Sequence, residues 1–203
     1  MVPFEPLLLG AVLGVRHALE PDHLAAITTM VSGNEGPRAA ARTGAAWGLG
    51  HALAIVLLGG ALVALGVKVP ARLAVGLELG VAVMLVLLGA HALRTRERPA
   101  HVHVPRSRST LVGFVHGASG TAAITLLCAT TFRSSLSALG FLLLFAIGAT
   151  LSMSVMSGLL ATPMSALSRR NARASTFLRV GGAVAAFGAA AFVVVQVLRG
   201  VPS

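Results

Sequence analysis

The chain has 203 residues, of which 56% are hydrophobic and 11% are charged, and its mean hydropathy is +0.87. Soluble domains carry about 25% charged residues, so this composition predicts an integral membrane protein and excludes an ordinary soluble enzyme. The net charge of +10 comes from arginines between apolar segments, without interleaved aromatic residues, which excludes a nucleic-acid interface. The single cysteine, Cys128, excludes a Cys-x-x-Cys redox pair and a zinc cluster.

Apolar segments of about 20 residues or more predict membrane-spanning helices. In chain order, the six that qualify are Phe4–Val31, Ala39–Leu65, Ala71–Leu93, Thr110–Thr131, Leu136–Leu160 and Phe177–Leu198. We therefore expect an all-α integral membrane protein with one transmembrane domain, residues 1–203. Its halves, about 1–95 and 110–203, are joined by a loop at 96–109 that is rich in histidine and arginine.

The distribution of positive charge predicts the orientation. The connections after the first, third and fifth segments hold 11 Lys and Arg, and the opposite side holds 4. Positively charged loops stay in the cytoplasm, so the 96–109 loop is predicted to be cytoplasmic and both termini to lie outside. His101 and His103 then belong to a solvated cytoplasmic loop.

A faint internal repeat relates the two halves. His17 followed by Ala-Ala-Ile-Thr at 25–28 is matched by His116 followed by Ala-Ala-Ile-Thr at 122–125. Three segments separate the two copies, so the halves run in opposite directions. Inverted repeats with broken helices at their interface are typical of secondary transporters. The expected architecture is two inverted three-helix repeats.

The first segment contains an unusual group of polar residues. Arg16, His17, Glu20, Asp22 and His23 stand where hydrocarbon is expected. Each charge facing lipid at a helix centre costs roughly 2.5–3.5 kcal/mol. These side chains must therefore face other helices or an aqueous cavity, which makes them functional candidates.

On a straight helix His17, Asp22 and His23 point in different directions. Pro21 has no N–H for the carbonyl of His17 and its ring crowds that carbonyl, so we expect the helix to break near Pro21. The opened turn lets two imidazoles and a carboxylate converge on one point. Imidazole with carboxylate suits Ni, Co, Zn or Cu better than Mg or Ca. Because imidazoles must be neutral to bind a metal, binding should weaken as the pH falls.

Further polar residues extend this predicted site. His51, between small residues of the second segment, and His116, which opens the second half, are candidate ligands. Arg16, Glu20 and Pro21 are expected to support the site, with Arg16 as a partner for Glu20 or Asp22. Glu78 is interpreted either as an ion-pair partner of Arg16 or Arg179 or as a proton-coupling group.

The motif Arg-His-Ala-Leu-Glu-Pro-Asp-His at 16–23 resembles the signature helix of the nickel/cobalt permease (NiCoT) family, especially its short UreH-like branch. Trp47-Gly-Leu-Gly-His51, Val112-Gly-Phe-Val-His-Gly117 and the central histidine-containing loop support the resemblance. It implies a bacterial cytoplasmic-membrane carrier of Ni²⁺, or of Co²⁺, that often supplies a nickel enzyme. It also implies that His17, Asp22 and His23 recognise the metal.

The sequence thus predicts a transporter and no catalytic residues. The metal is bound near mid-membrane by His17, Asp22, His23, His51 and His116, as substrate and without an organic cofactor. Membrane lipid and the divalent ion are the expected partners, and assembly into a homo-oligomer is left open. The alternatives are an exporter of metal, an exporter of a small anion that uses Arg16, and a haem-binding membrane subunit with histidine axial ligands.

Overall fold

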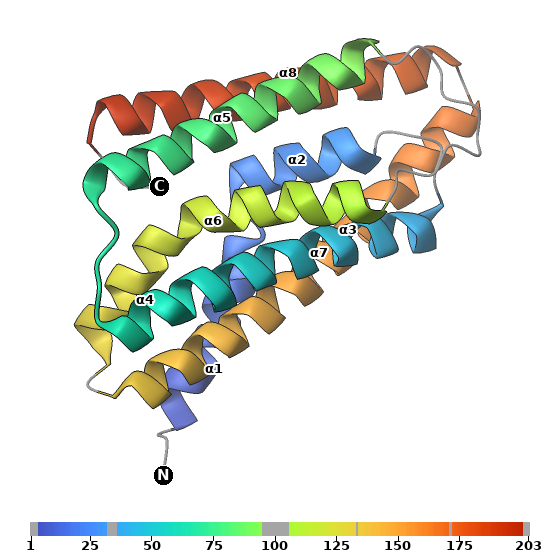
Figure 1. Cartoon of the computed structure of the whole chain (residues 1–203). Helices are drawn as coiled ribbons and strands as arrows, with labels where there is room; N and C mark the ends of the chain where they lie inside the picture. Colours follow the sequence, from blue (N-terminus) through green and yellow to red (C-terminus); the bar gives the residue numbers. More distant parts are fainter. Residues whose placement is uncertain (1–3, 32–35, 95–105, 133, 171, 201–203) are drawn as a thin grey trace.

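The computed structural model describes residues 4–31, 36–94, 106–132, 134–170 and 172–200, and in these ranges all regular structure is helical (Figure 1). The elements are α1 (Phe4–His17), α2 (Pro21–Val31), α3 (Pro37–Ala54), the π-helical turn η1 (Ile55–Gly59), α4 (Gly60–Leu65), α5 (Ala71–Arg94), α6 (Arg106–Thr131), α7 (Ser135–Arg170) and α8 (Ala172–Leu198). The prediction of an all-helical protein is confirmed for the described residues.

The first predicted segment is broken, as expected, immediately before Pro21. The amide of Glu20 bonds to the carbonyl of His17 at 3.1 Å, and the amide of Leu19 bonds to that of Arg16 at 2.9 Å. These i to i+3 bonds tighten the end of α1, and the first of them satisfies the carbonyl of His17, for which Pro21 has no N–H. Pro21 then occupies the first position of α2, where its missing N–H costs nothing.

Five described stretches are long and apolar enough to cross a membrane: Pro37–Leu65, Ala71–Arg94, Ser107–Cys128, Ser135–Leu167 and Arg173–Leu198. The first predicted segment is not among them, because the break divides it into helices of 14 and 11 residues. The six predicted crossings thus become five continuous spans and one broken segment.

Two predicted connections are shorter than expected. Helix α6 already begins at Arg106, inside the predicted 96–109 loop, and α7 continues past Leu160 to Arg170. Pro163 lies inside α7, where the hydroxyl of the adjacent Thr162 donates to the carbonyl of Gly158 at 3.0 Å.

The first part of the chain, α1 to α5, and the second part, α6 to α8, make corresponding helix contacts. Helix α1 packs on α7 as α6 packs on α3, and α2 contacts α8 as α6 contacts α5. Helices α3 and α7 contact each other, as do α5 and α8, and each of these pairs runs antiparallel in Figure 1. The α5–α8 pair covers the side of the bundle that carries α2 and α6.

Close contact between α3 and α6 depends on two glycines. A Cβ atom on Gly50 would overlap the carbonyl oxygen of Thr110, and one on Gly113 would overlap that of Trp47. Glycine at both positions therefore lets the two backbones touch, as is usual for closely packed membrane helices. This contact sets α3 and α6 close to each other at the level of His51 and His116.

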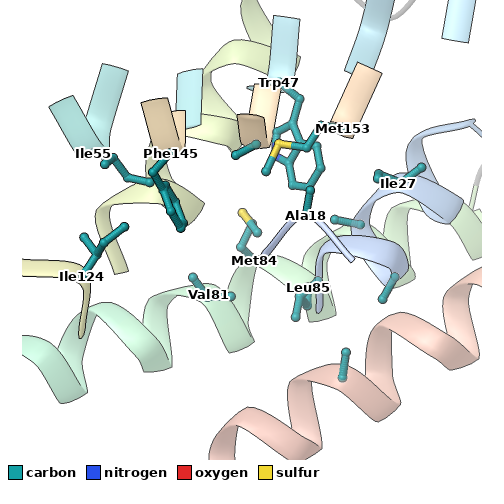
Figure 2. Packing of buried hydrophobic residues seen from close by; sticks show 14 of the residues in the cluster. Ala18, Ile27, Trp47, Ile55, Val81, Met84, Leu85, Ile124, Phe145 and Met153 are labelled. Carbon is teal, nitrogen blue, oxygen red and sulfur yellow. The ribbon is translucent and has the colours of Figure 1, made fainter. Parts of the chain in front are cut away.

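The buried apolar core surrounds the break. Ala18, in the unwound turn, is fully buried, and Figure 2 shows it among side chains that include Trp47, Met84, Leu85 and Met153. Aliphatic and aromatic packing of this kind holds the irregular backbone inside protein rather than lipid, which is the condition for non-helical backbone at membrane depth.

Candidate metal-binding site

The structure brings together all five predicted metal ligands. His17 ends α1, Asp22 and His23 begin α2, His51 lies in α3 and His116 in α6. The ring centroid of His23 lies 4.4 Å from that of His17, 5.3 Å from that of His51 and 4.2 Å from that of His116. Residues almost one hundred positions apart thus form one cluster around the break.

Carboxylates hold three of these imidazoles. Asp22 accepts hydrogen bonds from Nδ1 of His23 at 3.1 Å and from Nε2 of His116 at 2.9 Å. Glu20 contacts Nδ1 of His17 at 2.9 Å. A carboxylate on one ring nitrogen fixes the tautomer and leaves the lone pair of the other nitrogen for a metal.

The second nitrogens of these rings are buried and face no hydrogen-bond partner among the described residues. They are Nε2 of His17, Nε2 of His23 and Nδ1 of His116, together with both ring nitrogens of His51. Leaving a buried polar atom unpaired costs about 1–3 kcal/mol. A cation bound by the free lone pairs of these rings would remove much of this cost.

Two overlapping groups have the spacing of metal ligands. One ligand atom from each of His17, His23 and His51 lies within 4.8 Å of the others, and the same holds for Asp22, His23 and His116. His23 belongs to both groups, so the two groups share one residue.

The backbone at the start of α2 stabilises the negative charge of Asp22. Asp22 stands in the first turn of α2, where unpaired amide groups and the helix dipole stabilise negative charge. The break thus creates a new helix N-terminus beside the imidazoles. His23, His51 and His116 are buried, whereas His17 and Asp22 are partly accessible.

The supporting residues divide into two groups. Glu20 and Pro21 adjoin the cluster, as expected. Arg16 lies exposed on α1, and the carboxylates of Glu20 and Asp22 contact imidazoles instead of its guanidinium. In the structure Glu20 contacts His17, and Asp22 contacts His23 and His116, so none of these pairs involves Arg16. Glu78 is buried on α5 and lines a separate cavity.

Two aromatic residues of the site were not predicted. The ring of Trp47 lies 5.5 Å from that of His23 and 5.7 Å from that of His116, and Phe145 of α7 lies 5.2 Å from His17. Trp47 precedes His51 by four residues, so helical spacing could have indicated a shared face. No sequence signal pointed to Phe145.

Two of the histidines named from the sequence cannot be placed. His101 and His103, expected in a solvated loop, lie outside the described residues.

Five helical stretches able to cross a membrane define a multi-pass membrane protein. The chain is 28% identical over 193 residues to the urease accessory protein UreH of Bacillus sp. (strain TB-90), and the match covers 87% of this chain and 85% of the relative. This confirms the predicted resemblance to UreH-like proteins. No protein-family model and no solved structure matches the chain.

Proposed function

We propose that the chain transports Ni²⁺, with Co²⁺ as the second candidate, across the bacterial cytoplasmic membrane. The observation that carries this proposal is the convergence of buried imidazole nitrogens from His17, His23 and His51 within 4.8 Å of one another. Imidazole-rich sites suit nickel and cobalt, whereas calcium and magnesium prefer oxygen ligands. The similarity to a urease accessory protein supports nickel as the substrate.

The proposed site divides the work between ligands and orienting groups. The ion is bound by His17, His23 and His51. Glu20 holds the His17 ring by its Nδ1 atom, and Asp22 holds the His23 ring by its Nδ1 atom. Asp22 also reaches His116, from the other half of the chain. The ion loses most of its water on binding and regains it on release. The close contact of the four rings favours a single ion over a haem between them.

The packing of the helices supports alternating access. Each contact that α1 or α2 makes with the second half has a counterpart made by α6 with the first half. We infer two inverted repeats that meet at the histidine cluster. In such folds the halves rock about a fixed central site. The excess of arginine in the connections after the first, third and fifth predicted segments supports an orientation with both termini outside.

Nickel uptake tests this function. Radiolabelled Ni²⁺ should accumulate in cells that contain the wild-type chain, and Asp22→Asn should abolish uptake at equal membrane levels. Asparagine keeps the volume of Asp22 but cannot accept two imidazole N–H bonds with a full negative charge. Glu5→Gln, at the start of α1, is the matched control and should transport normally.

Absence of uptake by the wild type, with no change in cellular nickel or metal tolerance, would contradict the proposal. In that case the purified protein should be tested for anion binding that is lost in Arg16→Ala. It should also be tested for a haem absorption band. A wild type that lowers cellular nickel would instead indicate export through the same site.

A further inference from the structure

A cavity of ≈ 380 Å³ lies at one end of the bundle, away from the histidines. Its walls come from α4, the connection between α4 and α5, the first turns of α5, the last turns of α6 and the start of α7. Most of the lining is apolar, and the polar groups include Glu78, Thr125 and Lys68. In Figure 1 the α4–α5 connection and the α6–α7 connection lie at the same end of the molecule.

Three helices run from the histidine cluster to this cavity. On α6, Thr125 in the cavity wall follows His116 by nine residues, about 13 Å along the helix axis. On α7, Ala138 lines the cavity and precedes Phe145, whose ring touches that of His17. The stretch α3–η1–α4 likewise leads from His51 to the cavity wall. The cavity therefore lies between the histidines and this end of the bundle.

A layer of buried residues lies between the histidines and the cavity. Ile55 and Leu142, at intermediate positions on their helices, are each 1% exposed. A Cβ atom built on Gly59 would lie 3.4 Å from Thr121, 3.5 Å from Thr125 and 3.7 Å from Leu142, so these elements meet at one point. The π-helical turn at Ile55–Gly59 forms part of this layer, and π turns often mark functional positions in membrane and soluble helices.

Glu78 gives the cavity its chemical character. Its side chain is 7% exposed, although it lies on a helix long and apolar enough to cross a membrane. An acidic residue at such a position is costly and marks an ion or substrate pathway by default. The hydroxyl of Thr125 donates to the carbonyl of Thr121 at 2.7 Å, so its oxygen keeps lone pairs for a cation or its water. Lys68 is exposed, in the α4–α5 connection at the mouth.

We propose that this cavity is the outer vestibule of the carrier and that Glu78 binds the hydrated divalent cation there before it reaches the histidines. The inference rests on the proposed function and adds a second cation site to it. The arginine distribution puts this end of the bundle outside. The layer of Ile55 and Leu142 is then the outer gate, closed in this structure.

Cysteine labelling tests whether the cavity opens to the outside. In a Cys128→Ala background, Ala74→Cys places a thiol in the cavity wall one turn before Glu78, and Leu73→Cys places one beside it on the exposed face of α5. A charged, membrane-impermeant methanethiosulfonate added to intact cells should modify the Ala74→Cys thiol at least ten times faster than the Leu73→Cys thiol. Both thiols must react fully in denatured protein.

Equal rates, or modification of Ala74→Cys only in inside-out vesicles, would overturn the vestibule. This readout does not need nickel transport, so it separates failure of the vestibule from failure of the proposed function.

Glu78→Gln tests the cation site itself. At subsaturating Ni²⁺, uptake should fall about tenfold and the half-saturating concentration should rise, while the equilibrium affinity of the histidine site for Ni²⁺ in the purified variant stays unchanged. Lys68→Gln, at the mouth, is the control and should transport at least as well as the wild type. Unchanged uptake, or loss of equilibrium binding, would overturn the role given to Glu78.

Discussion

The two histidine-bearing segments that begin the halves of the chain fold differently. In the first half, Ala-Ala-Ile-Thr follows His17 after eight positions, and the intervening residues form the break between α1 and α2. In the second half the same four residues follow His116 after six positions, and α6 continues without interruption. Compared with the second half, the first half thus has two additional residues, and Pro21, in the stretch that contains the unwound turn.

The difference shows what the break contributes. An unbroken helix at His116 presents one imidazole to the centre of the bundle. The broken segment presents His17 and His23 together, with Glu20 and Asp22 bonded to them. The two halves therefore pack alike but contribute different groups to the site. The first half supplies three histidines and two carboxylates, and the second half supplies one histidine and the aromatic ring of Phe145.

Removing a first-half ligand should have the largest effect. His51→Ala deletes one of the three converging imidazoles, so Ni²⁺ affinity should fall more than about 100-fold, beyond the usual effect of losing an outer partner. Isothermal titration of the purified protein measures this. His91→Ala, on α5, is the matched control and should bind nickel normally. An unchanged affinity for His51→Ala would show that the site lies elsewhere.

Removing the second-half histidine should affect transport more than binding. His116→Ala leaves His17, His23 and His51 in place but frees one oxygen of Asp22, so affinity should fall about tenfold. Uptake should be lost, because the second half no longer contributes a histidine to the site about which the halves rock. Affinity and uptake that fall by the same factor would contradict this division between the halves.

Loss of the Glu20 carboxylate should have a smaller effect than loss of either histidine. Glu20→Gln removes the acceptor that holds Nδ1 of His17, but the side chain of Glu20 is 48% exposed and its interaction is weakened by water. We expect nickel affinity to fall less than about tenfold, the lower limit for outer partners. A loss as large as that of His51→Ala would identify Glu20 as a ligand.

The smallest effect is expected at the break itself. Pro21→Ala increases the freedom of the unfolded chain and should lower the free energy of unfolding by about 0.4–1 kcal/mol. Since Asp22 and Glu20 still hold the rings, nickel affinity should change only a few-fold. Thermal unfolding in detergent, with and without Ni²⁺, measures both. A large loss of affinity would mean that proline alone maintains the break.

Much of the site could be predicted because charge inside a membrane is costly. The polar residues at 16–23 had to face protein, and Pro21 had to disturb the helix, which together indicated convergence of His17, Asp22 and His23. The partner choices could not be predicted in this way. Whether Asp22 meets a metal, Arg16 or two imidazoles depends on how the turn at 18–20 is directed.

The helix boundaries and the cavity show a similar limit. Hydropathy located the apolar segments but not the polar ends of helices, so α6 and α7 extend beyond their predicted bounds. Glu78 stood out as a buried acid, yet the cavity around it is formed by segments up to 76 positions apart, from Leu62 to Ala138. Phe145 and η1 resemble ordinary apolar sequence and carry no local signal.

Nickel X-ray absorption spectroscopy of the metal-loaded protein shows directly whether histidines surround the ion. We expect about three imidazole nitrogens around the ion in the wild type, one fewer in His51→Ala, and no change in His91→Ala. A nickel ion surrounded only by oxygen ligands, or an unchanged imidazole signal in His51→Ala, would contradict a site built by His17, His23 and His51.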